Sequence, residues 1–392
     1  MLILLDCRPL QLPSQNVEKK TVILFCTKIL AKEQDIKWLF LVDETCQDGF
    51  LPGVTDDRIL RRSALPGKAG WKIWLDWQIP SVVKEFRPDL VLMTGSRTAS
   101  RLSVPQCLWL SEWIEPGEGG KRRSGQRRLA KQLIKSLAKA QAVFTFSEKD
   151  KNFLTGLPAD KVTHAKILAI PVASEDPFGS LERELPAGEG KQGIKEQYAE
   201  GKEYFLVDVA GATDAQRVDL LKAFSLFKKR QLSNMQLVLC GGHSGPGHDF
   251  SSRLESYKYR RDVHRVEELP EAERMRLLGA AYGFVFLFPG DSLGIPVMDA
   301  WRAGVPVITA AAGYLPEMAG EGVLYARPGD PASLAGQLMS LYKDERLRGD
   351  LIEKGKDRAG SFSGERSAAQ VWAGIRMAMG RQGDGGIAGI GN

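Results

Sequence analysis

In segment 288–306, FPGDSLGIPVMDAWRAGVP, two aspartates flank a loop that contains a glycine and leads to a proline. A buried-strand pattern ends at Pro289, and a helix pattern begins at Ile295 and Pro296. Proline is favoured in a first helical turn, and Gly294 lets the backbone approach a ligand closely. The N–H groups of a first helical turn suit a phosphate. We therefore expect the backbone at Gly294, Ile295 and Pro296 to border a binding pocket.

The two carboxylates lie at different points of this strand–loop–helix segment. Asp291 precedes the loop, and Asp299 lies one turn inside the helix on the side of Pro296. Both carboxylates could therefore border the same pocket. The spacing is equally compatible with Asp299 complementing the helix dipole and Asp291 making a turn. Both interpretations stay open on spacing alone.

The elements that must position these residues follow an alternating pattern. Short apolar runs alternate with amphipathic stretches of helix length, which predicts an α/β fold with parallel sheets covered on both faces. Strands are expected at 2–5, 38–42, 90–93, 106–110, 142–146, 167–170, 204–209, 236–239, 284–288 and 305–309. Helices are expected at 20–32, 72–86, 127–139, 214–229, 271–281 and 295–303.

The alternation lapses once, after Ile170, in a stretch rich in Pro, Gly, Glu and Lys. A chain of 392 residues is long enough for two ordinary domains. We therefore predict two Rossmann-like domains facing a central cleft: an N-terminal domain over 1–175, a linker over 176–201 and a C-terminal domain over 202–380. The glycine-rich residues 381–392 are expected to be a disordered tail.

The number of cysteines and the lengths of the apolar runs limit the classes of protein to which the chain could belong. Five scattered cysteines without a CxxC pair argue against a disulfide framework or a zinc site and fit a reducing cytosol. The opening MLILLDCR reads as a first buried strand rather than a signal peptide. No apolar run approaches the roughly 18–20 residues that a membrane span needs. We expect a soluble, cytoplasmic protein.

Residues 121–139 carry eight Lys and Arg and no acid, with leucines and an isoleucine at three- and four-residue spacing. The segment is predicted to be a basic amphipathic helix. It could dock its apolar face on the core, or it could make peripheral contact with an anionic membrane on its inner face. No nucleic-acid motif accompanies it, so no nucleic-acid partner is expected.

Other kinds of chemistry lack their motifs. Gly241–His248 holds two histidines but no further ligand at metal spacing, so no metal site is predicted. The sequence contains no GxxxxGK[ST], which argues against P-loop nucleotidases. No GxGxxG directly follows an expected strand, as the dinucleotide fingerprint requires, which argues against a nicotinamide-dependent oxidoreductase.

The sequence resembles the retaining GT-B glycosyltransferases of the large GT4 group. Their signature of two glutamates around a Gly-Leu-Pro is similar to Asp291-Ser-Leu-Gly-Ile-Pro-Val-Met-Asp299-Ala300. The continuation over 303–309 and Leu315-Pro-Glu317 resembles the segments that follow it in the family. Further matching landmarks, in order along the chain, are LDCRPL at 5–10, WQIP at 77–80, RPDL at 87–90, FSEKD at 146–150 and the strand and helix at 204–224.

The resemblance implies transfer of a sugar from a nucleotide-sugar donor to a glycan or lipid-linked acceptor, with retained anomeric configuration and no cofactor. Asp291 would contact the donor sugar, and Asp299 the ribose. The backbone at Gly294–Pro296 would hold the diphosphate. Arg217 falls where the family's phosphate-binding lysine usually lies, although an ordinary solvated helix arginine is the alternative. The turn at Gly211 would belong to the same donor site.

On the acceptor side, Ser111 and Glu112 stand where many relatives carry His-Asp, and the resemblance gives them catalytic roles. Four features depart from the family pattern: both signature glutamates are aspartates, Ala212 replaces a basic residue, Ser111 replaces the histidine, and residues 14–20 replace a glycine-rich loop. Small displacements of reacting groups cost rate steeply. Two interpretations follow: an active glycosyltransferase in polysaccharide or lipopolysaccharide assembly, or a catalytically degenerate GT-B module that binds a nucleotide, a glycan or a partner subunit.

Overall fold

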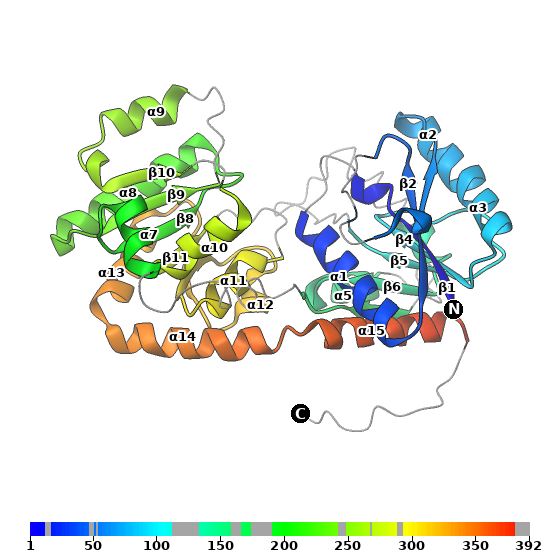
Figure 1. Cartoon of the computed structure of the whole chain (residues 1–392). Coiled ribbons are helices and arrows are strands. Elements are labelled where there is room, and N and C mark those ends of the chain that lie inside the picture. The colour runs from blue at the N-terminus through cyan, green and yellow to red at the C-terminus, as the bar shows by residue number, and fades with distance from the viewer. Residues whose placement is uncertain are drawn as a thin grey trace. The chain divides into compact units, whose positions relative to one another are not determined.

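The computed structural model describes residues 1–11, 17–46, 51, 54–111, 133–157, 166–173, 190–241, 248–266, 269–287 and 293–380. The chain forms two compact units: Met1–Ser174 with Ser363–Asn392, and Glu175–Phe362. Each unit is built on one parallel sheet with helices on both faces, as the coloured ribbon shows (Figure 1). The expectation of two Rossmann-like α/β domains is thereby confirmed. Within the described part of the chain, every helix is too short or too polar to span a bilayer.

Unit 1 contains a seven-stranded sheet in the order β3-β2-β1-β4-β5-β6-β7. Its strands are β1 Leu2–Asp6, β2 Lys37–Asp43, β3 Ile59–Arg62, β4 Leu90–Thr94, β5 Gln106–Trp109, β6 Ala142–Thr145 and β7 Lys166–Ala169. Its helices are α1 Val17–Glu33, α2 Gly67–Ile73, α3 Ile79–Phe86, α5 Glu148–Thr155 and α15 Gly364–Ala378, with a π-helical turn at Trp74–Gln78 between α2 and α3. Strands such as β4, buried along their whole length, read as uninterrupted apolar runs because helices cover both faces.

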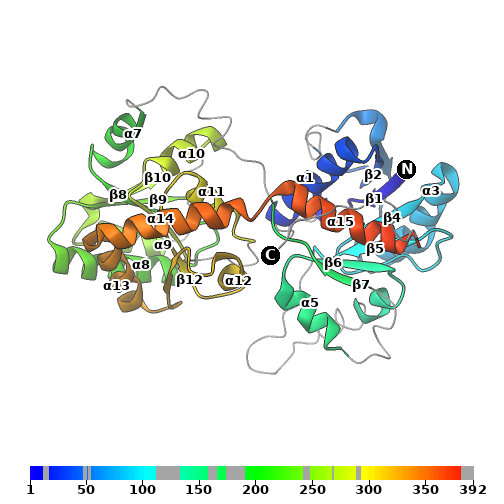
Figure 2. The ribbon, with the colours of Figure 1, turned by 90° about the horizontal axis from the view of Figure 1, so that it is seen from below.

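The last helix belongs to unit 1, which corrects the expected domain 202–380. Helix α15 packs against α1 and β6 (Figure 2). Its Ser367 Oγ donates a hydrogen bond to the Pro171 carbonyl at 2.8 Å. A side chain at Gly374 would lie 2.3 Å from the Phe144 ring of β6, so only glycine permits this contact. The expected boundary was wrong because an amphipathic pattern shows that a helix has an apolar face, but not which core covers it.

Unit 2 contains a six-stranded sheet in the order β10-β9-β8-β11-β12-β13. Its strands are β8 Tyr204–Asp208, β9 Gln236–Cys240, β10 Val263–Val266, β11 Gly283–Phe286, β12 Val307–Ala310 and β13 Leu324–Ala326. Its helices are α7 Gly190–Ala199, α8 Asp214–Gln231, α9 His248–Glu255, α10 Glu271–Gly279, α11 Ile295–Arg302, α12 Leu315–Ala319, α13 Pro331–Lys343 and α14 Glu345–Gly360. Helices α8 and α13 pack together over one cluster of buried side chains, whereas α11 packs against α14.

Part of the expected linker 176–201 is also structured, because α7 packs against α10, the edge strand β10 and its neighbour β9 of unit 2. Residues 174–189 and 381–392 lie outside the described residues. The predicted basic helix 121–139 is described only from Leu133 onward. There, Leu133 and Leu137 are buried in the core of unit 1. The apolar face of the segment therefore docks on the core where it is described.

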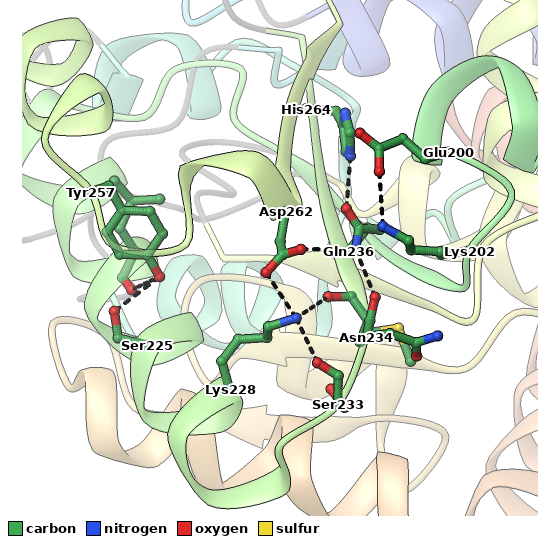
Figure 3. A network of polar contacts seen from close by, with 12 residues as sticks. Glu200, Lys202, Ser225, Lys228, Ser233, Asn234, Gln236, Tyr257, Asp262 and His264 are labelled. Atoms are coloured by element: carbon green, nitrogen blue, oxygen red, sulfur yellow. Dashed lines mark hydrogen bonds and ion pairs between the residues drawn. The ribbon is translucent and has the colours of Figure 1, made fainter.

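A polar network fixes the end of the unit 2 sheet where β9 and β10 begin (Figure 3). Lys228, 6% exposed, lies 2.9 Å from Asp262 Oδ2 and donates to the backbone carbonyls of Ser233 and Met235. Gln236 Nε2 donates to Asp262 Oδ1 at 3.1 Å. These contacts anchor the last turn of α8 to the strands, on the edge opposite the strand carboxyl ends.

Candidate functional site

The strand order of unit 2 reverses between β8 and β11. From β8 the chain adds β9 and β10 on one side, then returns to add β11, β12 and β13 on the other. All these neighbours are parallel, so their carboxyl ends share one edge. Open parallel sheets bind ligands at such a reversal, outside the carboxyl ends of the strands. The loops that follow β8 and β11 are those in which the sequence places Gly211 and Gly294.

The loop after β8 is a tight turn that begins α8. Gly211 has φ +73°, a conformation that favours glycine, and no atom of the described residues lies within 4 Å of the position a Cβ would take. Thr213 and Gln216 form a reciprocal capping box, in which each side chain accepts a hydrogen bond from the other residue's backbone N–H. The local sequence therefore fixes where α8 starts, and the open turn leaves its backbone accessible to a ligand.

Arg217 lies in the first turn of α8 and is held in place. Its Nη1 is 3.4 Å from Asp214 Oδ1, and its guanidinium carbon is 5.9 Å from the centre of the Phe250 ring of α9. The side chain is 19% exposed. The Nε group is buried and donates no hydrogen bond within the described residues. Arg217 is thus a partly buried, fixed cation rather than a freely solvated one.

The start of α11 is shaped by Gly294. This residue has φ +78°, and a Cβ there would lie 2.6 Å from Met318 Sδ of α12. Glycine is therefore required for both backbone conformation and packing. The N–H groups of Val297 and Met298 donate to the Gly294 carbonyl at 3.0 and 3.1 Å. Pro296 has no N–H, so its part in a phosphate site is limited to fixing the backbone of the first turn.

Asp299 is buried between two arginines. Its side chain is 5% exposed, with Oδ1 at 3.6 Å from Arg302 Nη1 and Oδ2 at 4.0 Å from Arg274 Nη2. Arg302 follows on the same helix, whereas Arg274 comes from α10. The carboxylate therefore takes part in an ion-pair network as well as lying in the predicted position.

Two further residues at this edge were missed by the sequence reasoning, Asp208 and Arg274. Asp208 ends β8, and its Oδ1 accepts a hydrogen bond from the Ala210 N–H at 2.8 Å. Burial raises the pKa of Asp208, and this hydrogen bond and the Arg274 charge act against the rise. An aspartate directly after a buried strand was a visible signal. Arg274 gave none, because only the folding of α10 brings it near Asp208 and Asp299.

The remaining predicted site residues are not brought into this cluster. Asp291 and Glu112 lie outside the described residues. Ser111 follows β5 in unit 1, is 2% exposed, and its Oγ makes no hydrogen bond within the described residues. The catalytic roles of these three residues stay predictions. The described residues also contain no grouping of three or more His, Cys, Asp or Glu side chains able to hold a metal ion.

Unit 1 has its own reversal of strand order, between β1 and β4. A small cavity of about 40 Å³ lies there, lined by Asp6, Pro9, Trp71, Leu75, Thr94, Gly95, Ser96 and Arg97. The guanidinium carbons of Arg8 and Arg97 lie 4.4 and 5.3 Å from the centre of the Trp71 ring. This cavity, which the sequence reasoning did not predict, presents polar groups at the edge of unit 1 where a ligand is expected.

Asp6 is the unusual member of this cavity. It is fully buried, and its Oδ1 accepts hydrogen bonds from Trp74 Nε1 at 3.0 Å and the Arg8 N–H at 3.2 Å. Its Oδ2 has no hydrogen-bond partner within the described residues. Burial raises the pKa of Asp6 to about 7, against the lowering effect of these hydrogen bonds and of the Arg8 charge. Near neutral pH, Asp6 can therefore exist as either a proton donor or a carboxylate.

Known proteins resemble this chain in both sequence and fold. Residues 191–358 match the model of the family described as Glycosyl transferases group 1. O-antigen chain mannosyltransferase B of Escherichia coli is 24% identical over 251 residues, which cover 62% of this chain and 63% of that protein. A D-inositol 3-phosphate glycosyltransferase of Corynebacterium glutamicum is 30% identical over 167 residues, covering 39% of this chain and 38% of the relative. The chain thus spans less than two thirds of the length of each.

The fold is shared over nearly the whole chain. The crystal structure of a glycosyltransferase from Rickettsia africae aligns with a TM-score of 0.71 at 13% identity, covering 97% of this chain and 99% of that protein. Such a likeness concerns the fold, and the family match concerns residues 191–358, which carry the loops that open α8 and α11. Over residues 191–358 the chain is similar to the glycosyl transferases group 1, and its two parallel-sheet units have the GT-B architecture.

Proposed function

We propose that the protein is a retaining glycosyltransferase that moves a sugar from a nucleotide diphosphate donor to an acceptor hydroxyl. One observation carries the proposal: the turn at Gly211 and the first turn of α11 flank the strand-order reversal of unit 2, with Asp299 and Arg274 beside them. The family match over the same residues supports this chemistry.

In this proposal the backbone around Gly211 and Gly294 holds the donor diphosphate. The charge that develops on the leaving nucleoside diphosphate is met by Arg217 and by the start of α11. Arg274 adds a second cation at the same edge, so the reaction draws its charge compensation from the protein and needs no cofactor. Asp299 accepts hydrogen bonds from the ribose, and Asp291 contacts the sugar.

Unit 1 supplies the acceptor side of the reaction. Ser111 and Glu112 are the residues proposed to act there, and the cavity beside Asp6 adds a carboxyl that can accept or donate a hydrogen bond. The acceptor class is a glycan or a lipid-linked glycan, as in polysaccharide or lipopolysaccharide assembly; the O-antigen mannosyltransferase relative supports this class. The proposed location is the cytoplasm, and contact of residues 121–139 with an anionic membrane stays a prediction.

A second candidate is a binding module without turnover. Ala212, where the family carries a basic residue, is 8% exposed and apolar, so one expected phosphate contact is missing. Incubation with a panel of nucleotide sugars separates the two candidates. A transferase hydrolyses its own donor slowly even without an acceptor, whereas a binding module leaves every donor intact.

The paired aspartates provide the sharper test. Asp299→Ala should weaken nucleoside diphosphate binding at least several-fold, because a hydrogen bond to a charged group contributes about 1.5–3 kcal/mol. Asp291→Ala should leave that binding nearly unchanged and abolish donor hydrolysis. Calorimetric titration beside a hydrolysis assay measures both effects.

Arg302→Gln is the matched control, because it breaks the same ion pair and keeps the Asp299 carboxylate. If Asp299 contacts the ribose, the control should bind nucleoside diphosphate much better than Asp299→Ala. Equal losses in Arg302→Gln and Asp299→Ala would show that the ion pair is only structural. Equal losses of binding in the two aspartate variants would contradict the proposed division of roles.

A further inference from the structure

Unit 1 contains a second and larger cavity, of about 470 Å³, which the proposed reaction does not use. It is formed by the last turns of α3 and by the segment that precedes β5; its lining residues include Lys84, Arg87, Arg101 and Ser103. Both β4 and β5 begin beside it. The cavity beside Asp6 lies at the other end of β4, so the length of that strand, about 15 Å, separates the two. A volume of this order is typical of sites for small organic ligands.

The charged residues that line this cavity all carry the same sign of charge. Among the residues that the structure describes, three cationic side chains line it and no acidic one does. The acids adjacent in sequence are engaged elsewhere: Glu85 pairs with Arg62 at 2.8 Å, and Asp89 Oδ2 accepts a hydrogen bond from the Leu2 N–H at 2.7 Å. Within the described residues, the side chains of Lys84, Arg87 and Arg101 take part in no ion pair that would neutralise them. Three like charges around one hollow favour a bound anion.

Arg87 holds its position at a conformational cost. It ends α3 with φ +49° and ψ +55°, the left-handed conformation that glycine usually supplies at this point of a helix. Any residue with a Cβ is strained in this conformation. Because a glycine would serve the fold better, the arginine points to a role for its side chain in the cavity.

The other walls of the cavity are apolar, contributed by Pro80, Val83, Pro88, Leu102 and Val104. We propose that this cavity binds an organic phosphate, with the phosphate against Lys84, Arg87 and Arg101 and a sugar or apolar body against these walls. One guanidinium group can donate two parallel hydrogen bonds to the oxygens of a phosphate, and the Ser103 hydroxyl can donate another. The site goes beyond the proposed function, since the donor diphosphate is held in unit 2.

The test is calorimetric titration of the full chain with inorganic pyrophosphate. Replacement of Lys84, Arg87 and Arg101 by glutamine should weaken one pyrophosphate site at least ten-fold, since each lost contact involves two charged groups. Replacement of Lys37, Lys68 and Lys72 by glutamine is the matched control, because these exposed lysines of unit 1 lie outside the cavity and carry the same charge. That control should bind like the parent.

Pyrophosphate can also bind at the proposed donor site, so Arg217→Gln is titrated alongside. Loss of binding in Arg217→Gln together with unchanged binding in the cavity variant would overturn the cavity site and leave the donor site standing. Weaker pyrophosphate binding by the cavity variant, together with unchanged binding by Arg217→Gln, would support the cavity site. That result does not depend on whether the donor site exists. Equal binding by the cavity variant and its lysine control overturns the inference as well.

Arg87→Gly separates binding from folding. Glycine relieves the left-handed conformation, so this variant should melt at or above the temperature of the parent while it binds pyrophosphate more weakly. A second arm identifies the source of the phosphate. Co-sedimentation with phosphatidylglycerol vesicles, lost in the cavity variant but not in its control, indicates a lipid headgroup; cavity-dependent pyrophosphate binding without vesicle binding indicates a soluble phosphate ester.

Discussion

Asp6 illustrates how one buried carboxyl acquires an unusual proton affinity. Two donors converge on its Oδ1, but Oδ2 is buried without a partner within the described residues. Removal from water therefore outweighs the hydrogen bonds and the Arg8 charge, and the pKa rises to about 7. At neutral pH this carboxyl can exchange a proton, a property common among groups in functional sites.

This raised pKa predicts how stability depends on pH. The folded state keeps a proton on Asp6 that the unfolded chain has released, so the contribution is complete below about pH 4 and is lost as pH rises through about 7. Asp6→Asn keeps the Oδ1 acceptor and cannot ionise. The free energy of unfolding of the parent, relative to Asp6→Asn, should fall by up to about 4 kcal/mol between pH 4 and pH 8.

Denaturant unfolding at a series of pH values measures this difference. Asp57→Asn, an exposed carboxyl of the same unit, is the control and should follow the parent. Parallel curves for the parent and Asp6→Asn would show that Asp6 does not titrate in this range.

At the scale of elements, α8 connects two polar sites. Its first turn carries Arg217 beside the Gly211 turn, and its last turn carries Lys228 within the network of Figure 3. The capping box fixes one end of the helix, and the contacts of Lys228 with Asp262 and two carbonyls fix the other. The helix that positions Arg217 is therefore held at both ends.

Lys228→Ala should destabilise unit 2 by about 3 kcal/mol, because it leaves the half-buried Asp262 without its main counter-charge. Lys229→Ala is the matched control, since Lys229 is exposed on the same turn and should change stability by no more than about 0.5 kcal/mol. Thermal or denaturant unfolding measures both variants. If both variants lower the free energy of unfolding by the same small amount, the network around Lys228 contributes no more to stability than an exposed lysine does.

At the scale of the whole molecule, each unit has candidate site residues at its own reversal of strand order. In unit 1 the reversal lies between β1 and β4, and in unit 2 between β8 and β11. The chain also crosses from unit 2 back to unit 1 at its end, because α15 packs on α1 and β6. Unit 1 is therefore complete only when the last helix is present.

A chain that ends at Phe362 should show a lower melting temperature for unit 1. It loses the buried side chains of α15, among them Val371 and Ile375, and each such residue contributes about 1.5–3 kcal/mol. Scanning calorimetry with and without nucleoside diphosphate separates the units, because a ligand of unit 2 raises the melting temperature of that unit. A chain that ends at Gly380 is the control and should melt like the full chain. A loss confined to unit 2 would favour the boundary expected from the sequence.

The pattern of neighbouring residues was sufficient to predict much of the fold and some residues of the candidate site. Apolar runs such as Leu90–Met93 predicted buried parallel strands, because covered strands need apolar side chains on both faces. Gly294 was predicted because a turn that opens a helix beside a ligand needs a backbone conformation that other residues avoid, whereas Gly211 came only from the family resemblance; both have positive φ. These properties depend on neighbours along the chain, and a single sequence displays them directly.

Three strands were missed, β3, β10 and β13, each of which lies at an edge of its sheet. Their segments are short, and the burial of each is partial, as in Ile59–Arg62 with its two arginines. Pairing with the neighbouring strand, rather than an apolar pattern, makes such a segment a strand. The sequence therefore gives little signal for them.

Outside the signature segment Asp291–Ala300, tertiary structure decided which charged groups lie together at the candidate sites. Arg274 approaches Asp299 and Asp208 from a different helix, and the pKa of Asp6 depends on its burial beside Trp74. The unit to which α15 belongs was settled by packing as well. By itself the sequence determined the α/β class, the sheet-forming runs and the helix-opening glycines, since these follow from periodicity and backbone conformation. Tertiary structure alone decided which distant charges meet and which core covers each helix, because electrostatic energy and burial depend on separation in space and not on separation along the chain.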